Sequence, residues 1–386
     1  MKRTLKKKVC MLVSVQQPFE VRLFHREAKT LVEAGYLVTI IAQYDKTEIV
    51  DGVRIVGIGK TGSRFSRILH TAKIFNRALA ERADIYQVHN PELLLWGVLL
   101  KFFTKRPVIY DVHEDFPDAV KIRDWIPRYL RGPLSLMVDI YERVLTRLID
   151  YVVTADEQTS GRFLHSNKRV LTLFNFPRIA YLKGIANVKK TSKSVKIVIH
   201  AGSLSPERGG DIMLEAFKTV KEVVQGARLL LIGDFTTPYG LNLKRKVIKY
   251  GLEDSVTLVD YLPHEQVLEY IAKSDVGLSL LQPVPKFMKN IPQKIFEYMA
   301  CGVPSVISDL PPVRPFIETS QAGILVSPSN PVKIAESIVF LLQHPEEARK
   351  MGESGRRAVL EEYNWEKESK KLLEVYEELL TTLRLQ

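Results

Sequence analysis

The sequence is poor in the features that mark secreted, metal-binding or membrane-spanning chains. Its two cysteines, Cys10 and Cys301, lack metal-ligand spacing and are too few for a disulfide scaffold in 386 residues, so we expect a reducing cytoplasm. The apolar run 93–100 stops at Lys101, far short of the ~20 residues of a membrane-spanning helix. The run 9–15 follows a lysine-rich start, as in a signal peptide, but it is short and no cleavage site follows. We expect it to be a buried strand.

Low-complexity tracts and short repeats are also missing, and the length suits two domains rather than one core. The net charge of +12 is uneven along the chain. Residues 1–190 hold 32 Lys/Arg and 19 Asp/Glu, a difference of +13, whereas residues 191–386 hold 24 and 25, a difference of −1. A basic first half favours an anionic ligand or surface, or is simply a solvated lysine-rich surface.

Short apolar runs alternate with longer amphipathic stretches. The runs predicted as strands are 9–15, 37–42, 53–58, 85–88, 108–112, 151–154, 197–200, 229–232, 256–259, 276–280, 305–307 and 324–326. Strands of this length joined by helices predict an α/β chain with two Rossmann-like parallel sheets, which we expect to face each other across a cleft. We interpret 1–180 as an acceptor-side domain, 181–194 as a linker, 195–362 as a nucleotide-sugar domain, and 363–386 as a helix that packs back on the first domain.

A glycine-containing turn follows the first strand of the second half. Residues 200–210 read HAGSLSPERGG, and a helical pattern comes next. Such a turn presents backbone N–H groups at the positive end of a helix, and the guanidinium of Arg208 suits phosphate oxygens. The turn therefore predicts a phosphate site, although a purely structural turn with a surface arginine would read the same way.

A second segment, 285–309, reads as loop, helix, glycine stop and strand. Lys294 and Glu297 are three residues apart in its helical part and so share one helical face. The amine could meet a phosphate and the carboxylate could accept the hydroxyls of a ribose. The alternative is an ordinary surface ion pair.

Residues 291–306, IPQKIFEYMACGVPSV, resemble the P-x-K-x-F-E-x-M-A-x-G-x-P-V signature of the retaining glycosyltransferases of family 4. The turn 202–209, the strand end 230–234 and the segments 256–263 and 272–276 also match the family in order. The resemblance implies the GT-B fold, a UDP- or GDP-sugar donor, retention of anomeric configuration and no bound cofactor or metal.

The resemblance implies a set of donor-binding residues: Gly202, Ser203, Arg208, Gly209, Asp234, Leu262, Lys289, Asn290, Lys294 and Glu297. Among them, Glu297 is implied to bind the ribose and Arg208 the diphosphate. Two positions depart from the family pattern. Ser203 stands where many members have an arginine, and Lys289 where many have a glutamate near the donor sugar, which leaves the identity of the sugar open.

Two histidines, His89 and His113, end predicted strands of the first half. Residues 111–117, DVHEDFP, resemble a subgroup of family 4 that acts on bacterial surface polysaccharides, in which this histidine contacts the transferred sugar. The resemblance thus implies a catalytic role for His113. The neighbouring Glu114 and Asp115 are candidates to orient His113 or the acceptor hydroxyl, unless they are only solvated loop acids.

The expected reaction breaks a glycosyl–phosphate bond through an oxocarbenium-like state. It mainly requires electrostatic stabilisation of the leaving diphosphate. No Asp-x-Asp motif stands at a plausible donor position, and the resemblance implies metal independence. It also implies attack on the same face as departure, with the leaving phosphate oxygen taking up the acceptor proton.

On the acceptor side, Glu20 and Arg22 follow the first strand where many relatives have a Gly-Gly pair, and we group them with His89. The segment 121–131 mixes cations with Trp125 and other large apolar residues. Such a segment could rest on the inner face of the cell membrane, where each cation contributes up to ~1 kcal/mol, or form a basic lid over the site.

We therefore expect a cytoplasmic hexosyltransferase, peripheral at the membrane, that glycosylates a saccharide or lipid-phosphate-linked acceptor in envelope polysaccharide or glycolipid synthesis. A UDP-N-acetylglucosamine 2-epimerase-like enzyme is an alternative that would need no acceptor. A non-catalytic nucleotide-sugar-binding or scaffold protein is another, which Ser203 and Lys289 favour. Nucleic acid is excluded as a partner, because the basic half lacks interleaved aromatic residues and any known motif.

Overall fold

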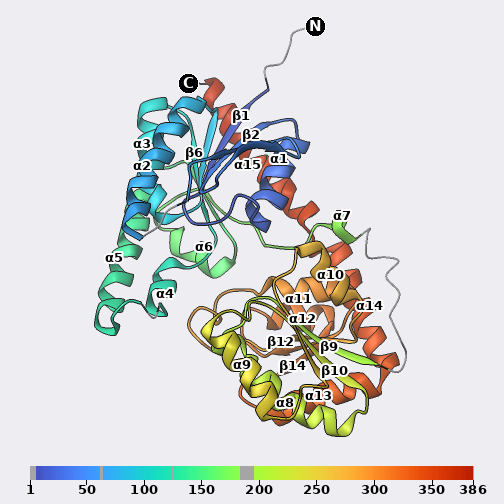
Figure 1. Ribbon diagram of the computed structural model, residues 1–386. Coiled ribbons are helices and arrows are strands. Elements are labelled where there is room, and N and C mark those ends of the chain that lie inside the picture. Colours follow the sequence, from blue (N-terminus) through green and yellow to red (C-terminus); the bar gives the residue numbers. More distant parts are fainter. Residues whose placement is uncertain (1–5, 61–63, 124, 183–194, 386) are drawn as a thin grey trace. The chain divides into compact units, whose positions relative to one another are not determined.

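Each half of the chain builds its own sheet. The computed structural model describes residues 6–60, 64–123, 125–182 and 195–385. It divides into a first unit, Met1–Asn175 with Glu366–Gln386, and a second unit, Phe176–Trp365 (Figure 1). Most of the stretch interpreted as a linker, residues 183–194, lies outside the described residues.

The sheet of the first unit has the order β3–β4–β2–β1–β5–β6–β7–β8. Its strands are β1 (Lys8–Leu12), β2 (Leu37–Ala42), β3 (Thr47–Val50), β4 (Val53–Gly57), β5 (Ile85–Val88), β6 (Val108–Val112), β7 (Tyr151–Thr154) and β8 (Val170–Thr172). Every neighbouring pair is parallel except β3–β4. The strands predicted for this half all form. The additional β3 and β8 lie at the sheet edges, where partial burial does not demand a continuous apolar run.

The helices of the first unit are η1 (Val21–Ala28), α1 (Lys29–Glu33), α2 (Arg64–Glu81), α3 (Pro91–Thr104), α4 (Phe116–Lys121), α5 (Arg128–Thr146), α6 (Glu157–Phe163) and most of α15 (Trp365–Leu385). η1 is a π-helix, a rare geometry that is frequent at functional sites and that apolar periodicity does not distinguish from an α-helix. None of the helices in the described part of the chain is long and apolar enough to span a membrane.

The C-terminal helix α15 packs on the first unit, as expected from the sequence. The hydroxyl of the buried Tyr376 donates to Gln87 of β5. The backbone N–H of Phe174 donates to Glu368 over 2.9 Å, and Arg169 pairs with Glu378 at 3.2 Å. α15 therefore returns to the unit in which the chain begins.

The second unit has a six-stranded parallel sheet of order β11–β10–β9–β12–β13–β14. Its strands are β9 (Lys196–Ala201), β10 (Ala227–Ile232), β11 (Val256–Val259), β12 (Val276–Ser279), β13 (Ser305–Ser308) and β14 (Gly323–Val326). The helices are α7 (Ile179–Leu182), η2 (Pro206–Arg208), α8 (Gly210–Val223), α9 (Pro238–Lys249), α10 (His264–Ala272), α11 (Gln293–Ala300), α12 (Arg314–Ser320), α13 (Pro331–Gln343) and α14 (Pro345–Glu361).

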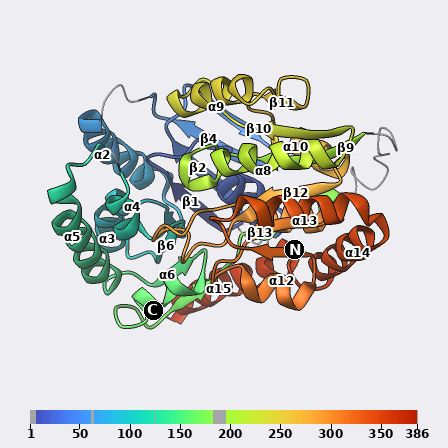
Figure 2. The ribbon, with the colours of Figure 1, turned by 90° about the horizontal axis from the view of Figure 1, so that it is seen from below.

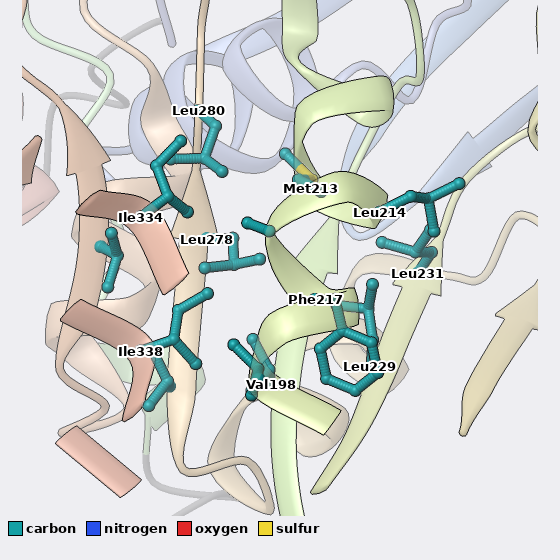
Figure 3. Close-up of a cluster of buried hydrophobic side chains, with 14 of the residues drawn as sticks. Val198, Met213, Leu214, Phe217, Leu229, Leu231, Leu278, Leu280, Ile334 and Ile338 are labelled. Atoms are coloured by element: carbon teal, nitrogen blue, oxygen red, sulfur yellow. The ribbon is translucent and has the colours of Figure 1, made fainter. Parts of the chain in front are cut away.

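Alternate side chains of the central strands enter two different cores. Val198 and Leu229 pack with α8 and α13, which lie side by side on one face of the sheet (Figures 2 and 3). Their neighbours Ile199 and Leu230 pack on the opposite face, with α10 and with Tyr298 of α11. This period of two explains why the strands read as continuous apolar runs, because helices cover both faces.

The strand order fixes where each unit can bind a ligand. β9 lies between β10 and β12, and β1 lies between β2 and β5, so the chain changes direction across the sheet at these points. Ligands of doubly wound sheets bind at the carboxyl ends of the strands beside such a switch point. Ligands are therefore expected at the turn after β9 and at the residues that follow β1 and β5.

Candidate functional site

In the second unit, the turn after β9 is shaped by glycines. Gly209, at the start of α8, has a φ of 78°, and a Cβ there would lie 2.1 Å from the carbonyl oxygen of Leu280. Only glycine permits this approach, which brings the N-terminus of α8 against the segment that follows β12. The free N–H groups of that helix end therefore lie at the predicted phosphate site.

Lys294 of α11 is the central side chain of this site. It is only 7% exposed, its Nζ lies 3.1 Å from Nε2 of His200, and a Cβ on Gly202 would lie 3.2 Å from that amine. Burial and then the charge of Arg208 lower the pKa of Lys294 to about 7, although Glu297 opposes them. Burial and the nearby Lys294 also lower the pKa of His200 well below its usual value. The site thus holds a buried amine whose pKa a bound anion would raise, so that binding would favour its protonated form.

Arg208 completes the basic side of the site. Its guanidinium carbon lies 5.4 Å from the ring centroid of Phe287, so the planar group is supported by an aromatic face. Arg208 is also close enough to Lys294 to affect the pKa of that amine. The structure therefore brings together the two cations that the sequence assigned to the diphosphate.

Glu297 lies one helical turn beyond Lys294. Its Oε1 is 2.9 Å from Nε2 of His264, the first residue of α10, and its side chain is 13% exposed. The imidazole holds the carboxylate in one orientation while leaving part of it accessible. His264 was not predicted from the sequence, although its place directly after the 256–263 motif is a usable signal.

The other predicted donor residues are spread around this cluster. Asp234, just after β10, accepts from the backbone N–H and hydroxyl of Thr236 at 2.8 and 2.6 Å, and these bonds lower its pKa. Leu262 packs against the core under α10 and α11. Ser203 is exposed in the turn, and Lys289 and Asn290 are half-buried in the loop before α11. The backbone of Ser203 also hydrogen-bonds His200, the neighbour of Lys294.

In the first unit, the two strand-end histidines meet. His89 follows β5 and His113 follows the adjacent β6, and Nδ1 of His89 lies 2.9 Å from Nε2 of His113. Both nitrogens lie 3.3 Å from Oδ2 of Asp111. His89 is fully buried and burial lowers its pKa, whereas the side chain of His113 is 13% exposed. His113 is therefore the member of the pair that a ligand can reach.

Asp111 is held by a buried arginine from η1. Nη2 of Arg22 bonds Oδ1 of Asp111 at 2.9 Å, and Nε of Arg22 lies 2.9 Å from Glu27. Burial raises the pKa of Asp111, but the charges of Arg22 and His113 outweigh it and hold that pKa well below the usual range. Burial and the neighbouring Asp111 raise the pKa of Glu27 well above its usual value. One guanidinium thus contacts two buried carboxyl groups whose pKa values move in opposite directions.

This arrangement revises the roles expected on the acceptor side. The side chain of Arg22 is turned inward and fully buried, so it positions Asp111 rather than facing a ligand. Glu20 caps η1 by accepting from the N–H of Leu23 at 2.9 Å. Burial tends to raise the pKa of Glu20, but the charge of His113 and two backbone N–H groups lower it.

Of the two acids that follow His113, Asp115 has a structural role, and the role predicted for Glu114 stays a prediction. Asp115 is buried, caps α4 by accepting from the N–H of Asp118, and lies 3.4 Å from Arg162. It belongs to the start of a helix, and Asp111 instead orients His113. Glu114 is half-buried in the loop. The contact between Asp111 and His113 could have been predicted from their spacing, because residues two apart on a strand point to the same face.

His89, Asp111 and His113 also have the spacing of a metal site, with one ligand atom from each within 4.8 Å of the others. However, Nε of Arg22 lies 3.2 Å from the same Oδ2 of Asp111 that both histidines approach. A divalent cation would meet the charge of the guanidinium there. The residues present therefore fit a metal poorly, and the predicted metal independence stays a prediction.

Two family models together match most of the chain. The family described as Glycosyltransferase Family 4 matches residues 21–170, and the family described as Glycosyl transferases group 1 matches residues 184–358. The chain is 30% identical over 207 residues to N-acetyl-alpha-D-glucosaminyl L-malate synthase of Bacillus anthracis, covering 52% of this chain and 51% of that protein. It is 25% identical to alpha-D-kanosaminyltransferase of Streptomyces kanamyceticus, covering 47% of this chain and 46% of that protein. The chain thus spans about half the length of the curated relatives it matches.

Solved structures share the architecture over nearly the whole chain. A sucrose-phosphate synthase from Thermosynechococcus elongatus superposes with a TM-score of 0.77 at 19% identity, covering 98% of this chain and 100% of that chain. Anabaena HepE in complex with UDP-glucose superposes with a TM-score of 0.72 at 15% identity, covering 96% and 99%. Identities this low show the fold alone, and the fold is the predicted pair of Rossmann-like units.

Proposed function

The chain belongs to glycosyltransferase family 4, and from this premise we propose that it transfers a hexosyl group from a UDP- or GDP-sugar to an acceptor hydroxyl with retention. The observation that carries the proposal is the buried Lys294, which lies beside Gly202 and Arg208, with Glu297 one helical turn away. Basic groups and a helix N-terminus suit a diphosphate, and an oriented carboxylate suits a ribose.

In the proposed reaction, the bond between C1 of the sugar and the phosphate oxygen breaks, and the nucleoside diphosphate leaves with the electron pair. The acceptor oxygen forms the new bond to C1 on the same face, and its proton passes to the leaving phosphate oxygen. Lys294, Arg208 and the N-terminus of α8 stabilise the negative charge on the diphosphate. His113, held by Asp111, contacts the transferred sugar.

The acceptor is proposed to be a saccharide or a lipid-phosphate-linked glycan of the cell envelope. The names of several relatives support this class, among them an amylovoran biosynthesis glycosyltransferase of Erwinia amylovora and a chitobiosyldiphosphodolichol beta-mannosyltransferase of Candida albicans. We propose a cytoplasmic protein that works at the inner face of the membrane, in line with the basic first half of the chain.

The test is a panel of UDP- and GDP-sugars, each scored by the shift in thermal unfolding of the full chain. A ligand at 100 times its Kd stabilises the folded protein by roughly 2.7 kcal/mol. Lys294→Ala should remove most of that shift, because hydrogen bonds to charged groups contribute about 1.5–3 kcal/mol. Lys333→Ala, at an exposed position of α13, is the matched control and should keep it.

Three outcomes separate the alternatives. Turnover of UDP-N-acetylglucosamine in the absence of any acceptor would point to the epimerase-like reading. Binding of a nucleotide sugar without transfer to any acceptor of the envelope class would point to a scaffold. If no nucleotide sugar shifts the unfolding temperature, the proposed donor site is wrong.

A further inference from the structure

Helix α5 of the first unit carries apolar residues on both of its sides. Val138, Tyr141 and Leu145 pack against the core of the unit, where the buried residues of the helix are polar: Ser135, Glu142 and Thr146. Its exposed residues include Leu136, Met137 and Ile140, with 60%, 58% and 53% of their surfaces accessible. A surface helix of a globular protein normally carries charged and polar residues on the side that faces away from the core. The exposed apolar residues of α5 do not contribute to the core of the unit, so they suggest a surface that binds a partner.

The buried polar residues fix this orientation. Glu142 accepts from the hydroxyl of Tyr110 at 2.6 Å and from Arg162 at 2.8 Å. The hydroxyl of Thr146 donates within α5 and to Ser166 at 3.0 Å. Turning the helix about its axis would leave these groups buried without partners, which is costly. The outward apolar face is thus held in place by the fold of the unit.

The apolar face extends beyond a few side chains. Leu136, Ile140, Val144 and Leu148 recur every four residues and form one line of about 18 Å along and just past the helix. α3 contacts α5 and adds the exposed Phe102 and Phe103 (Figures 1 and 2). We call these six residues the α3–α5 face. Monomeric proteins rarely expose so continuous an apolar surface unless something binds it.

A pocket of about 480 Å³ lies where this face ends. Phe102 and Leu148 of the α3–α5 face line it together with Leu379 and Leu383 of α15. Its charged lining residues are mostly cations: Lys101, Lys105, Arg106 and Arg169, beside a single acid, Asp150. The pocket thus combines an apolar wall with basic groups, a composition that suits a lipid with an anionic headgroup.

The charges around the face select its partner. The exposed residues of α5 and its cap include Arg128 and Arg147 but no acid. The acids of the helix point elsewhere, because Asp139 pairs with Arg143 and Arg162 while Glu142 is buried. A second copy of the chain would bring cations against cations, which is repulsive. An anionic bilayer supplies both the apolar layer and the opposite charge.

We propose that the α3–α5 face docks on an anionic lipid bilayer. Ile140 and its neighbours enter the boundary between headgroups and acyl chains, the surrounding cations contact lipid phosphates, and the pocket accepts one anionic lipid. The segment 121–131, for which the sequence suggested this role, overlaps the start of α5 and contributes the exposed Trp125 and Tyr129. The proposal rests on surface residues of the first unit and does not depend on the donor site.

The test is co-sedimentation of the full chain with vesicles of phosphatidylcholine alone or mixed with phosphatidylglycerol. We expect binding to the mixed vesicles, weakening with added salt because the charges are exposed. The double variant Ile140→Glu and Val144→Glu should lower the partition coefficient at least about tenfold, because it places two anions in the apolar line. Ile248→Glu, at a 63% exposed position of α9 in the second unit, is the matched control and should bind like the original chain.

The proposal is overturned if the chain prefers neutral vesicles or binds neither kind, or if the double variant binds as well as the control. Light scattering detects the other occupant: self-association that the double variant abolishes, without vesicle binding, would assign the face to a second copy. Nucleotide-induced thermal stabilisation should be the same in the double variant as in the original chain. That measurement confirms folding and keeps failure of this proposal distinct from failure of the proposed donor site.

Discussion

Both units bury a charged side chain at the carboxyl end of a central strand, with opposite consequences. Asp111 in the first unit stays ionised, because the fully buried Arg22 bonds it directly. Lys294 in the second unit tends to lose its charge, because burial and the like charge of Arg208 both lower its pKa. The first site carries its own counterion, whereas the second is incomplete until an anion arrives. Burial alone therefore does not decide the charge of a buried group, since the charges of the surrounding side chains act with it or against it.

The largest effect is expected at Arg22, the buried counterion of Asp111. Arg22→Met should lower the free energy of unfolding by about 3–5 kcal/mol, because it leaves the carboxylate of Asp111 buried without a cation. Urea unfolding followed by circular dichroism measures the loss. Adding Asp111→Asn should restore part of the stability, because the uncompensated charge disappears.

The matched control is Arg54→Met. Arg54 also pairs with a carboxylate, Glu81, at 2.7 Å, but the arginine side chain is 46% exposed. Exposed pairs contribute about 0.2–1 kcal/mol, so this variant should unfold almost like the original chain. Equal losses for Arg22→Met and Arg54→Met would show that the buried guanidinium does not hold Asp111 in the way the geometry indicates.

The second prediction concerns protons taken up by Lys294. In the empty site its pKa is about 7, and a bound diphosphate should raise that pKa by supplying the missing negative charge. Binding therefore favours the protonated amine. Affinity should be full below about pH 7 and should fall as pH rises above it, by up to about tenfold per pH unit until the pKa of the complex is reached.

Calorimetry with a nucleotide sugar in buffers of different ionisation enthalpy measures this proton uptake directly. A nucleotide sugar is the right probe, because its diphosphate has no second ionisation near neutral pH. Lys294→Arg is the control, since a guanidinium keeps its proton throughout this range and should bind without this pH dependence. The same pH dependence in Lys294→Arg would mean that another group takes up the proton.

Fold and site differ in how far local sequence could predict them. The strands that helices cover on both faces were predictable because full burial demands a continuous apolar run. β3 and β8 were not, since edge strands are only half covered. Helix α5 was predictable as a helix, but the orientation that exposes its outer apolar residues was not. That orientation depends on Tyr110, Arg162 and Ser166, which lie far from α5 in sequence or on other elements.

For the site, motif residues on one helix were predictable and their partners were not. Lys294 and Glu297 stand in a recognisable signature, and the structure places Lys294 beside the predicted turn, with Glu297 three residues further along the same helix. His200 and His264 come from other elements and only meet that helix in the folded chain. Asp115 was a candidate because it is near His113 in sequence. Asp111 is the residue that contacts His113, because positions two apart along a strand point to the same face of the sheet.

The third and smallest effect is expected at His264. His264→Ala removes the bond that orients Glu297, which should cost about 1 kcal/mol, or roughly fivefold in affinity for a nucleotide sugar. If Glu297 receives the ribose hydroxyls, the loss should be specific to them. Isothermal titration of a ribonucleotide and its 2′-deoxy form measures this difference, and His264→Ala should bring the two affinities closer together. His344→Ala, on the exposed end of α13, should leave both affinities unchanged. An equal loss for both nucleotides would show that Glu297 does not bind the ribose and is only a structural partner of His264, so that Lys294 and Arg208 alone would remain as the charged groups of the proposed donor site.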